Sequence, residues 1–363
     1  MNKEWINHNQ AGALFFVFMT GSSIINIPGP LIAMAGNGAW ISLLLSGLCG
    51  FGVLAMLLYL SGRYPGLTYV DYSRKLIGNM LTVIFGLLSL TFLFQMLTAM
   101  VMDVGLFMVS SMLRETPIYT FTSLILLISA LTARAGIEVM ARMFMFIILL
   151  TALFVFSTLV FAIPDYMPEQ LLPILPKGIR PVLHGAYFSF GFPYAEVFVF
   201  GMLLHHVAKE YRKKVPAAML LSLGVNVLTL CVTTISSIMV FGPFGGDLPY
   251  ILFSMARLVE FQEIIQRIES IIGMSLILGS YMKSTITLYA ASLFAARLFK
   301  IEERSALVMP IALFCFLSGL VSFDGPANWG FMVSTVHPLW AGSVFVVPLL
   351  LLTVVAAFRK KAA

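Results

Sequence analysis

Long apolar segments, separated by short polar ones, make up most of this chain. A transmembrane helix needs about 20 consecutive, mostly apolar residues, and ten segments approach or exceed that length. They lie near residues 11–35, 39–60, 80–109, 118–133, 143–163, 182–205, 216–241, 270–296, 305–321 and 339–358. The connections between them are too short for a soluble domain. The pattern predicts an all-α integral membrane protein of ten transmembrane helices, forming a single transmembrane domain over residues 1–363.

Two of the ten segments carry helix-breaking residues deep inside their apolar runs. The first breaks at Thr20-Gly21-Ser22-Ser23, with Pro28-Gly29-Pro30 beyond, and the sixth breaks at Ser189-Phe190-Gly191-Phe192-Pro193. Interrupted helices at matching positions of two halves indicate a binding site near the membrane midplane of a transporter-type fold. Since each half holds five helices, the second half starts from the opposite side of the membrane. We therefore predict two inverted five-helix repeats, over about residues 5–165 and 180–358.

Charged residues are rare and unevenly placed. They make up 10% of the chain, against roughly 25% in a soluble domain, while hydrophobic residues make up 60%. With a cytoplasmic amino terminus, sixteen of the 22 Lys and Arg residues fall on inner segments and five on outer loops. The positive-inside rule therefore predicts that both termini are cytoplasmic. Membrane topology accounts for the net charge of +6, and we expect no nucleic-acid partner.

No sequence pattern in the chain indicates an enzyme. The sequence lacks a phosphate-binding glycine loop, a zinc-type spacing of His and Cys, and a nucleophile elbow. We therefore expect no catalytic residues, no cofactor and no metal site. Cys49, Cys231 and Cys315 each fall within an apolar segment and give no disulfide framework. The pair His205-His206, at the end of the sixth segment, is interpreted as a boundary feature.

The few ionisable residues inside the apolar segments are informative, because a charge at that depth is costly and usually faces a cavity or a partner. Glu196 follows the second break by three residues, Lys283 lies near the middle of the eighth segment, and Asp103 lies toward the outer part of the third. We interpret the three as proton- or ion-linked groups. We also expect the Lys283 ammonium to replace the sodium ion that related architectures hold between the first and eighth helices. The alternative is a structural ion pair, or a lysine that extends toward the interface.

The two breaks are expected to form the ligand site. Helix amino termini within them present free N–H groups to a carboxylate, and unwound carbonyls suit an ammonium, so an amino acid fits both. The candidate ligand contacts are Gly21, Ser22, Ser23, Gln95, Thr98, Ser189, Phe190, Gly191, Phe192 and Tyr194. Gly191 is expected to limit the size of the pocket, and Phe190 and Phe192 to form its wall. Kinks that hold no ligand are the alternative.

Five short stretches of the chain carry a family resemblance. They are residues 63–68 with Tyr72 and Gly78, residues 136–142, 172–181, 190–196 and 267–270. In this order they resemble the B-subunit family of bacterial spore germinant receptors, a branch of the amino acid–polyamine–organocation superfamily, and the resemblance covers essentially the whole chain. It implies the small-molecule-sensing membrane subunit of a receptor in the spore inner membrane. It also implies a germinant such as an amino acid, and partner A and C subunits. The first break, Gly21-Ser22-Ser23, departs from the Gly-x-Gly type that is common in the wider superfamily.

Three functions are compatible with these observations. The first is a receptor subunit in which a bound small molecule shifts the equilibrium between two conformations of the repeats. The second is a proton-coupled amino-acid permease that cycles substrate through the same site. The third is an assembly scaffold or ion conduit. Ligand binding with little net flux would indicate the receptor, and counterflow in vesicles without partners would indicate the permease.

Overall fold

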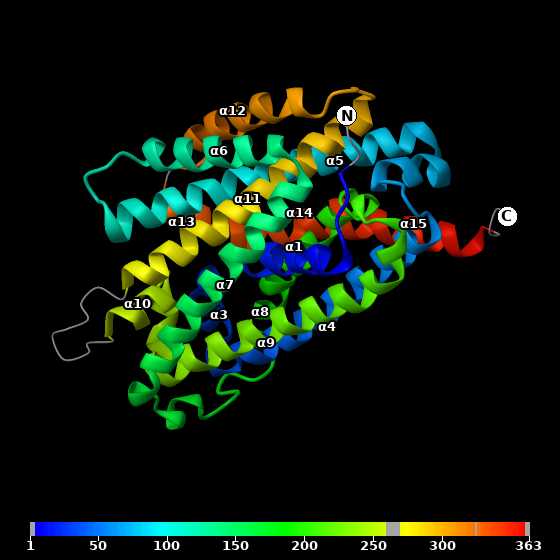
Figure 1. Cartoon of the computed structure of the whole chain (residues 1–363). Coiled ribbons are helices and arrows are strands. Elements are labelled where there is room, and N and C mark those ends of the chain that lie inside the picture. The colour runs from blue at the N-terminus through cyan, green and yellow to red at the C-terminus, as the bar shows by residue number, and fades with distance from the viewer. Residues whose placement is uncertain (1–3, 259–268, 324, 360–363) are drawn as a thin grey trace.

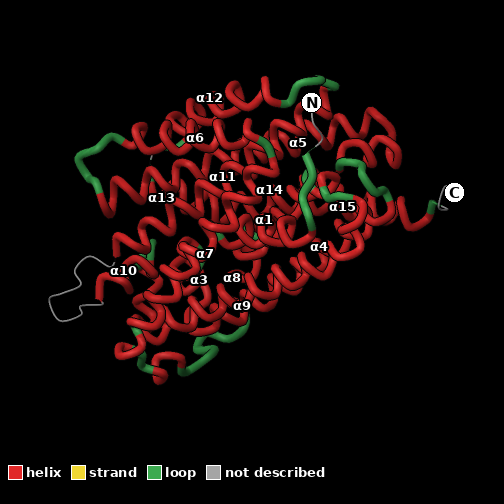
Figure 2. The backbone as a smooth tube through the Cα atoms, viewed as in Figure 1, coloured by secondary structure: helices red, strands yellow, loops and turns green. Residues whose placement is uncertain are grey.

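The computed structural model describes residues 4–258, 269–323 and 325–359. Over these residues the chain is almost entirely helical, and its only β-type pairing is an isolated parallel bridge between Ile6 and Val207. Short loops connect the helices, as the tube drawing in Figure 2 shows. The prediction of an all-α protein is therefore confirmed.

The described helices form two halves, divided by the loop that precedes residue 180. The first half contains α1 (His8–Thr20), α2 (Ser23–Asn26), α3 (Pro28–Ala35), α4 (Ala39–Arg63), α5 (Tyr69–Phe107), α6 (Ile118–Ala135) and α7 (Ile137–Phe161). The second half contains α8 (Arg180–Gly191), the 3₁₀ helix Tyr194–Met202, α9 (Val215–Phe241), α10 (Ile251–Leu258), α11 (Glu269–Phe299), α12 (Ser305–Ser322), α13 (Pro326–Phe331), α14 (His337–Ala341) and α15 (Val347–Phe358). The π-helical turns Met332–Val336 and Gly342–Val346 join the last three helices.

Eight described helical segments are long and apolar enough to cross a membrane. One of them, Pro28–Arg63, covers the end of the first predicted span together with the second. The two predicted spans that do not appear whole are the first and the sixth, which are interrupted where the sequence predicted a break. The broken first and sixth helices are therefore confirmed. Ten spans are counted only when these two interrupted segments are added to the set.

The break in the first helix depends on a glycine contact and a proline. α1 ends at Thr20, and the next residue, Gly21, packs against Gly279 of α11. A Cβ on either glycine would meet the carbonyl oxygen of the other at 2.5 Å or less, so neither backbone can carry a side chain here. Pro28 has no N–H to donate, and α2 accordingly ends before it while α3 begins with it.

The break in the sixth helix follows from Pro193. Phe192, the residue before it, is extended (φ −134°, ψ 109°), as steric contact with the proline ring favours. Since Pro193 donates no N–H, α8 ends at Gly191. The chain continues as the 3₁₀ helix Tyr194–Met202, whose nine residues are all buried.

The helix of the third predicted span has a kink close to the predicted start. α5 begins at Tyr69, where Thr68 and Asp71 form a reciprocal cap at its amino end. Gly78, with a φ of 82° and a ψ of 173°, is not helical and divides α5 into two helices, in a conformation that glycine adopts without strain. The helix after this kink starts beside residue 80, close to the predicted start of the span, and the polar turns from Tyr69 to Ile77 form a shorter helix before it.

The predicted start of the tenth span was wrong. Its helical segment begins at Pro326 and not near residue 339. The polar residues Ser334, Thr335 and His337 lie in this added stretch and lower its hydropathy. The extension places His337 inside the helical bundle, where its side chain is 7% exposed.

The interrupted helices lie at the centre of the molecule. Figure 1 shows α1 crossed by longer helices on several sides. α1 packs against α7, α9 and α11, while the 3₁₀ helix packs against α4 and α11, and α8 packs against α4 and α14. Backbone groups that lack helical hydrogen bonds are thus enclosed by protein, which is the condition for such backbone in a membrane protein.

Both ends of the described chain lie on one face of the bundle. Arg359 donates to the carbonyl of Lys75, Glu4 accepts from the backbone N–H of Ile137, and Ile6 pairs with the segment at Val207. Figure 1 shows the two termini toward the same end, away from α10. We call this the terminal face. Its segments, residues 4–6, 63–75, 134–138, 205–214, 297–304 and 359, are those that the charge pattern predicts to be cytoplasmic.

The contact between Gly21 and Gly279 gives the first testable prediction. We expect Gly279→Ala to destabilise the protein by about 1–3 kcal/mol, because its Cβ would overlap backbone that cannot move aside. Thermal unfolding of the purified protein in detergent measures the change. The matched control is Gly52→Ala, since a Cβ at Gly52 meets no atom within 4 Å. Equal melting temperatures for the two variants would contradict the role of this contact.

Candidate functional site

A buried ion pair joins the second break to α11. Lys283 Nζ lies 2.6 Å from Glu196 Oε2, and both side chains are fully buried. Glu196 comes from the 3₁₀ helix, and Lys283 comes from the middle of α11. His337 Nε2 lies 3.1 Å from the other carboxylate oxygen, Glu196 Oε1. The three side chains therefore connect the sixth, eighth and last helical segments through one carboxylate.

Aromatic rings enclose this group. Lys283 Nζ lies 4.1 Å from the centroid of the Phe192 ring and 5.1 Å from that of Phe18, distances at which a cation is attracted to the ring face. The ring of His337 packs against Phe92, with 4.7 Å between centroids. Since water is excluded from both charges, each depends on the other for compensation.

A second buried carboxylate lies on α5. Asp103 is 1% exposed, and it accepts hydrogen bonds from the Asn26 side-chain amide and, at 3.4 Å, from the Tyr250 hydroxyl. Asn26 ends α2, directly after the first break. Among the described residues, no Lys, Arg or His nitrogen lies within 4.0 Å of the Asp103 carboxylate. This carboxylate therefore has neutral hydrogen-bond donors and no cation in contact.

A small cavity lies between the two polar groups, and we call it the central cavity. Its volume is about 20 Å³, which is enough for roughly one water molecule. Its lining residues are Ser22, Asn26, Met96, Ala99, Met100, Asp103, Phe192, Glu196, Trp329, Val333 and His337. It thus combines residues of both breaks, both carboxylates and an apolar wall in one small space.

A larger vestibule lies next to the central cavity. It has a volume of about 310 Å³ and is bounded in part by Gly246, Asp247 and Pro249, in the connection between α9 and α10. Four residues line both spaces. They are Asn26, Phe192, Trp329 and Val333. These four side chains separate the central cavity from the face opposite the terminal face.

Comparison with known proteins assigns the chain to a family. Proteins described as "Spore germination protein" form a family that matches residues 5–322. The chain belongs to this spore germination protein family. Spore germination protein KB of Bacillus subtilis (strain 168) is 28% identical, over 99% of this chain and 97% of that protein. Spore germination protein YndE of the same organism is 26% identical, over 82% of each.

Solved structures share the fold of this family member. MhsT in complex with L-phenylalanine matches with a TM-score of 0.73 at 12% identity, over 98% of this chain and 99% of that one. A Na⁺-coupled sialic acid symporter matches with a TM-score of 0.68 at 11% identity, over 96% and 79%. MHP1, a nucleobase-cation-symport-1 family transporter, matches with a TM-score of 0.62 at 13% identity, over 95% and 79%. The chain is therefore an integral membrane protein with the fold of these proteins.

The residues predicted as ligand contacts divide into two groups. Ser22 and Phe192 line the central cavity, and the Ser22 hydroxyl has no hydrogen-bond partner within the described ranges. The others lie outside its lining. They are Gly21, Ser23, Gln95, Thr98, Ser189, Phe190, Gly191 and Tyr194.

Several residues of the second group make contacts with other helical segments. Thr98 donates to the carbonyl of Cys315 at 3.3 Å, and Ser189 donates to Ser46 Oγ at 2.8 Å. Gly191, which was expected to limit a pocket, instead allows close approach of the last helix, since a Cβ on it would lie 2.4 Å from the Cα of Pro338.

Sequence reasoning missed three of the polar and aromatic residues that line the cavity. Asn26 is a polar residue inside the first apolar segment, and this signal was available in the sequence. Trp329 and His337 carried no such signal, because both precede the predicted start of the tenth span. The Trp329 indole N–H donates to the carbonyl of Ala99 at 2.9 Å, which fixes the ring over the cavity.

The ion pair gives the second testable prediction. We expect Lys283→Met and Glu196→Gln each to destabilise the protein by about 3–5 kcal/mol, because each leaves a buried group without its partner. The double variant should lose less free energy of unfolding than the two single variants lose together. Chemical unfolding in detergent, followed by tryptophan fluorescence, measures all three.

A surface pair serves as the control for this cycle. Arg142 and Glu138 are 3.5 Å apart and largely exposed, so Arg142→Gln should cost at most about 1 kcal/mol. Strict additivity of the Lys283 and Glu196 variants would show that the two side chains do not interact.

Proposed function

We propose that this protein is the membrane subunit of a bacterial spore germinant receptor, and that it binds a small germinant, an amino acid, in the central cavity. Membership of the spore germination protein family supports the receptor role. The observation that carries the ligand assignment is the buried Asp103 carboxylate, which no cation of the described residues contacts and which faces a cavity between two interrupted helices. An α-ammonium group supplies the missing charge.

The lining of the central cavity matches both ends of an amino acid. Asp103 and the side-chain oxygen of Asn26 accept hydrogen bonds from the ammonium group. Ser22, whose hydroxyl is unbonded within the described ranges, donates to the carboxylate. Buried polar groups are stabilised when such partners are present, so the ligand completes the hydrogen bonding of the site. Phe192 and Trp329 then contact the side chain of the amino acid.

Lys283 removes the need for a sodium ion in this proposal. Its ammonium already neutralises Glu196 between the first and sixth segments, the charge that a bound cation would otherwise supply. Because this cation is covalently part of α11, it cannot be released with the ligand. We therefore expect the receptor to respond to the germinant independently of sodium.

Ligand entry requires movement of the wall toward the vestibule. The central cavity holds about one water molecule in this conformation, whereas the adjacent vestibule has a volume of about 310 Å³. Displacement of Phe192 and Trp329 would join the two spaces. Binding then favours the conformation with the enlarged site, and we propose that the A and C subunits detect this change in the spore inner membrane, with both termini in the cytoplasm.

The alternative function is a proton-coupled amino-acid permease. Asp103, Glu196 and His337 are titratable, buried and grouped around one cavity, as the coupling site of such a permease would be. A permease predicts that the purified protein, reconstituted in liposomes, exchanges labelled amino acid across the membrane. The receptor predicts binding with little or no flux.

Ligand binding gives the third testable prediction. We expect one or more amino acids to bind the purified protein saturably in nanodiscs, and Asp103→Asn to weaken that binding at least about 30-fold, the equivalent of about 2 kcal/mol. A scintillation proximity assay with labelled amino acids measures the affinity. The control is Asp165→Asn, which neutralises an exposed carboxylate outside the cavity.

Three outcomes are informative. Unchanged affinity in Asp103→Asn would contradict the proposed ammonium site. Equal losses in the two variants would indicate a general effect of charge. The absence of binding by any amino acid would favour an assembly scaffold or an ion conduit over both the receptor and the permease.

A further inference from the structure

A separate, larger cavity opens at the terminal face, and we call it the terminal cavity. Its volume is about 810 Å³. It is bounded by the amino-terminal segment at Glu4, the start of α5, the segment after the 3₁₀ helix and the end of α11. None of these residues lines the central cavity or the vestibule. The terminal cavity is thus distinct from the site described above.

Cations exceed carboxylates in its lining. The basic residues are Arg74, Lys209, Arg212, Arg297, Lys300 and Arg304, and the acidic residues are Glu4, Asp71 and Glu302. Two of the carboxylates are already bonded. Glu4 Oε2 accepts from Ile137 N at 2.8 Å, and Asp71 caps α5 and lies 4.0 Å from Arg297. Burial lowers the pKa of His206 to about 4, so this imidazole adds no charge at neutral pH. Six cations against three carboxylates leave this lining with a formal excess of three positive charges.

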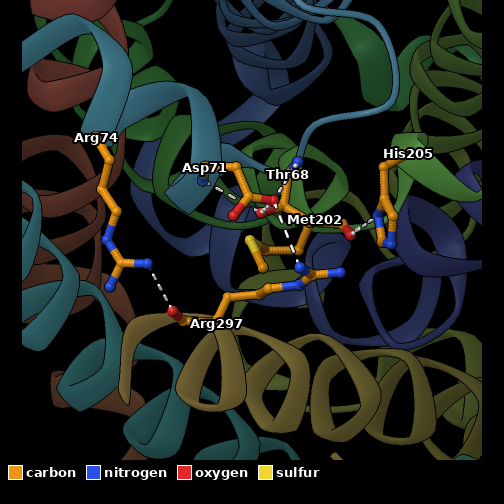
Figure 3. A network of polar contacts seen from close by, with 6 residues as sticks. All are labelled: Thr68, Asp71, Arg74, Met202, His205 and Arg297. Carbon is orange, nitrogen blue, oxygen red and sulfur yellow. Dashed lines mark hydrogen bonds and ion pairs between the residues drawn. The ribbon is translucent and has the colours of Figure 1, made fainter. Parts of the chain in front are cut away.

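Neutral groups hold two of the arginines in place. Arg74 donates to the backbone carbonyls of Arg297 and Leu298 at 3.0 and 2.7 Å. Figure 3 shows Arg74 reaching the carbonyl of Arg297, whose own side chain extends toward Asp71. Arg304 is 9% exposed and donates to Ala133 O, and its guanidinium carbon lies 3.9 Å from the centroid of the Tyr289 ring. Within the described residues, neither guanidinium lies within 4.0 Å of a carboxylate.

The cations belong to two walls. Arg74, Arg297, Lys300 and Arg304 come from the start of α5 and from the end of α11 with the loop after it, whereas Lys209 and Arg212 follow the interrupted sixth helix. Movement of the interrupted helix relative to α5 and α11 changes the distance between the walls. Like charges facing each other across the cavity oppose its closure, and an anion between them would favour it.

We propose that the terminal cavity binds a small molecule with two or more anionic oxygens, a phosphate compound or a polycarboxylate, which bridges the two walls and stabilises the closed terminal face. The planar guanidinium groups present paired N–H donors that match such oxygens. Lys209 contributes a point charge from one wall, and Lys300 contributes a point charge from the other. The ligand would act on the side that the charge pattern predicts to be cytoplasmic.

The fourth testable prediction uses the full chain in nanodiscs of zwitterionic lipid. We expect pyrophosphate or citrate to raise the melting temperature saturably, beyond sodium chloride at the same ionic strength, because these anions bind the folded state. The variants Lys209→Gln and Lys300→Gln should each raise the apparent dissociation constant about tenfold, and the double variant more. Lysines are chosen because, within the described residues, neither makes a hydrogen bond or ion pair that the fold needs.

The control is Lys213→Gln, which removes an exposed lysine of the same face that does not line the cavity. It should leave the effect of pyrophosphate and citrate unchanged. Stabilisation that chloride reproduces at the same ionic strength, or that survives the double variant, would overturn the proposal, as would an equal loss in Lys213→Gln. A parallel measurement with phosphatidylglycerol in the nanodisc identifies the source. Stabilisation by this lipid alone, lost in the double variant, would assign the same site to a headgroup.

Discussion

The contact between Lys283 and Glu196 is the constraint on which the centre of this molecule depends. Two charges enclosed by aromatic rings are stable only when they compensate each other, because neither is hydrated. Lys283 belongs to a continuous helix, whereas Glu196 lies just after the break in the sixth segment. The pair therefore fixes an interrupted helix against an uninterrupted one. His337 extends the same connection to the last helical segment. The electrostatic interactions of these side chains thus hold the interrupted backbone of the sixth segment in position, where regular helical hydrogen bonds are missing.

The two buried carboxylates differ in whether a cation of the described residues contacts them. Glu196 has a cation at 2.6 Å and an imidazole at 3.1 Å, so its charge is compensated within the chain. Asp103 has an amide and a phenol for partners and no contacting cation within the described residues. Because both line one cavity, an incoming ammonium finds one carboxylate satisfied and the other available. In the proposed receptor, this asymmetry selects a ligand that carries one positive charge.

The sequence predicted the helical class, both breaks and all three ionisable residues of the centre, because a proline or a charge inside an apolar run is a local and conspicuous signal. It did not predict which polar residues face the cavity. Thr98 and Ser189 have the same local signal as Ser22, yet they bond to Cys315 and Ser46 on distant segments. Gly191 packs closely against Pro338, and no sequence pattern near either residue indicates that the two helices are in contact. Partners distant in the sequence decide such roles. Averaging over windows likewise hid the start of the last span, and His337 with it.

The interrupted sixth helix lines the central cavity, and its continuation lines the terminal cavity. If a ligand at either cavity favours one arrangement of this helix, the two sites must influence each other, and linkage requires the effect to be equal in both directions. A polyanion that stabilises the closed terminal face would then change the affinity for the germinant by a certain factor. The germinant would change the affinity for the polyanion by the same factor. In the proposed receptor, Lys283 is a cation that cannot leave, so no sodium gradient drives the protein between its conformations. The binding energy of ligands at the two cavities then supplies a means of shifting the equilibrium between these conformations.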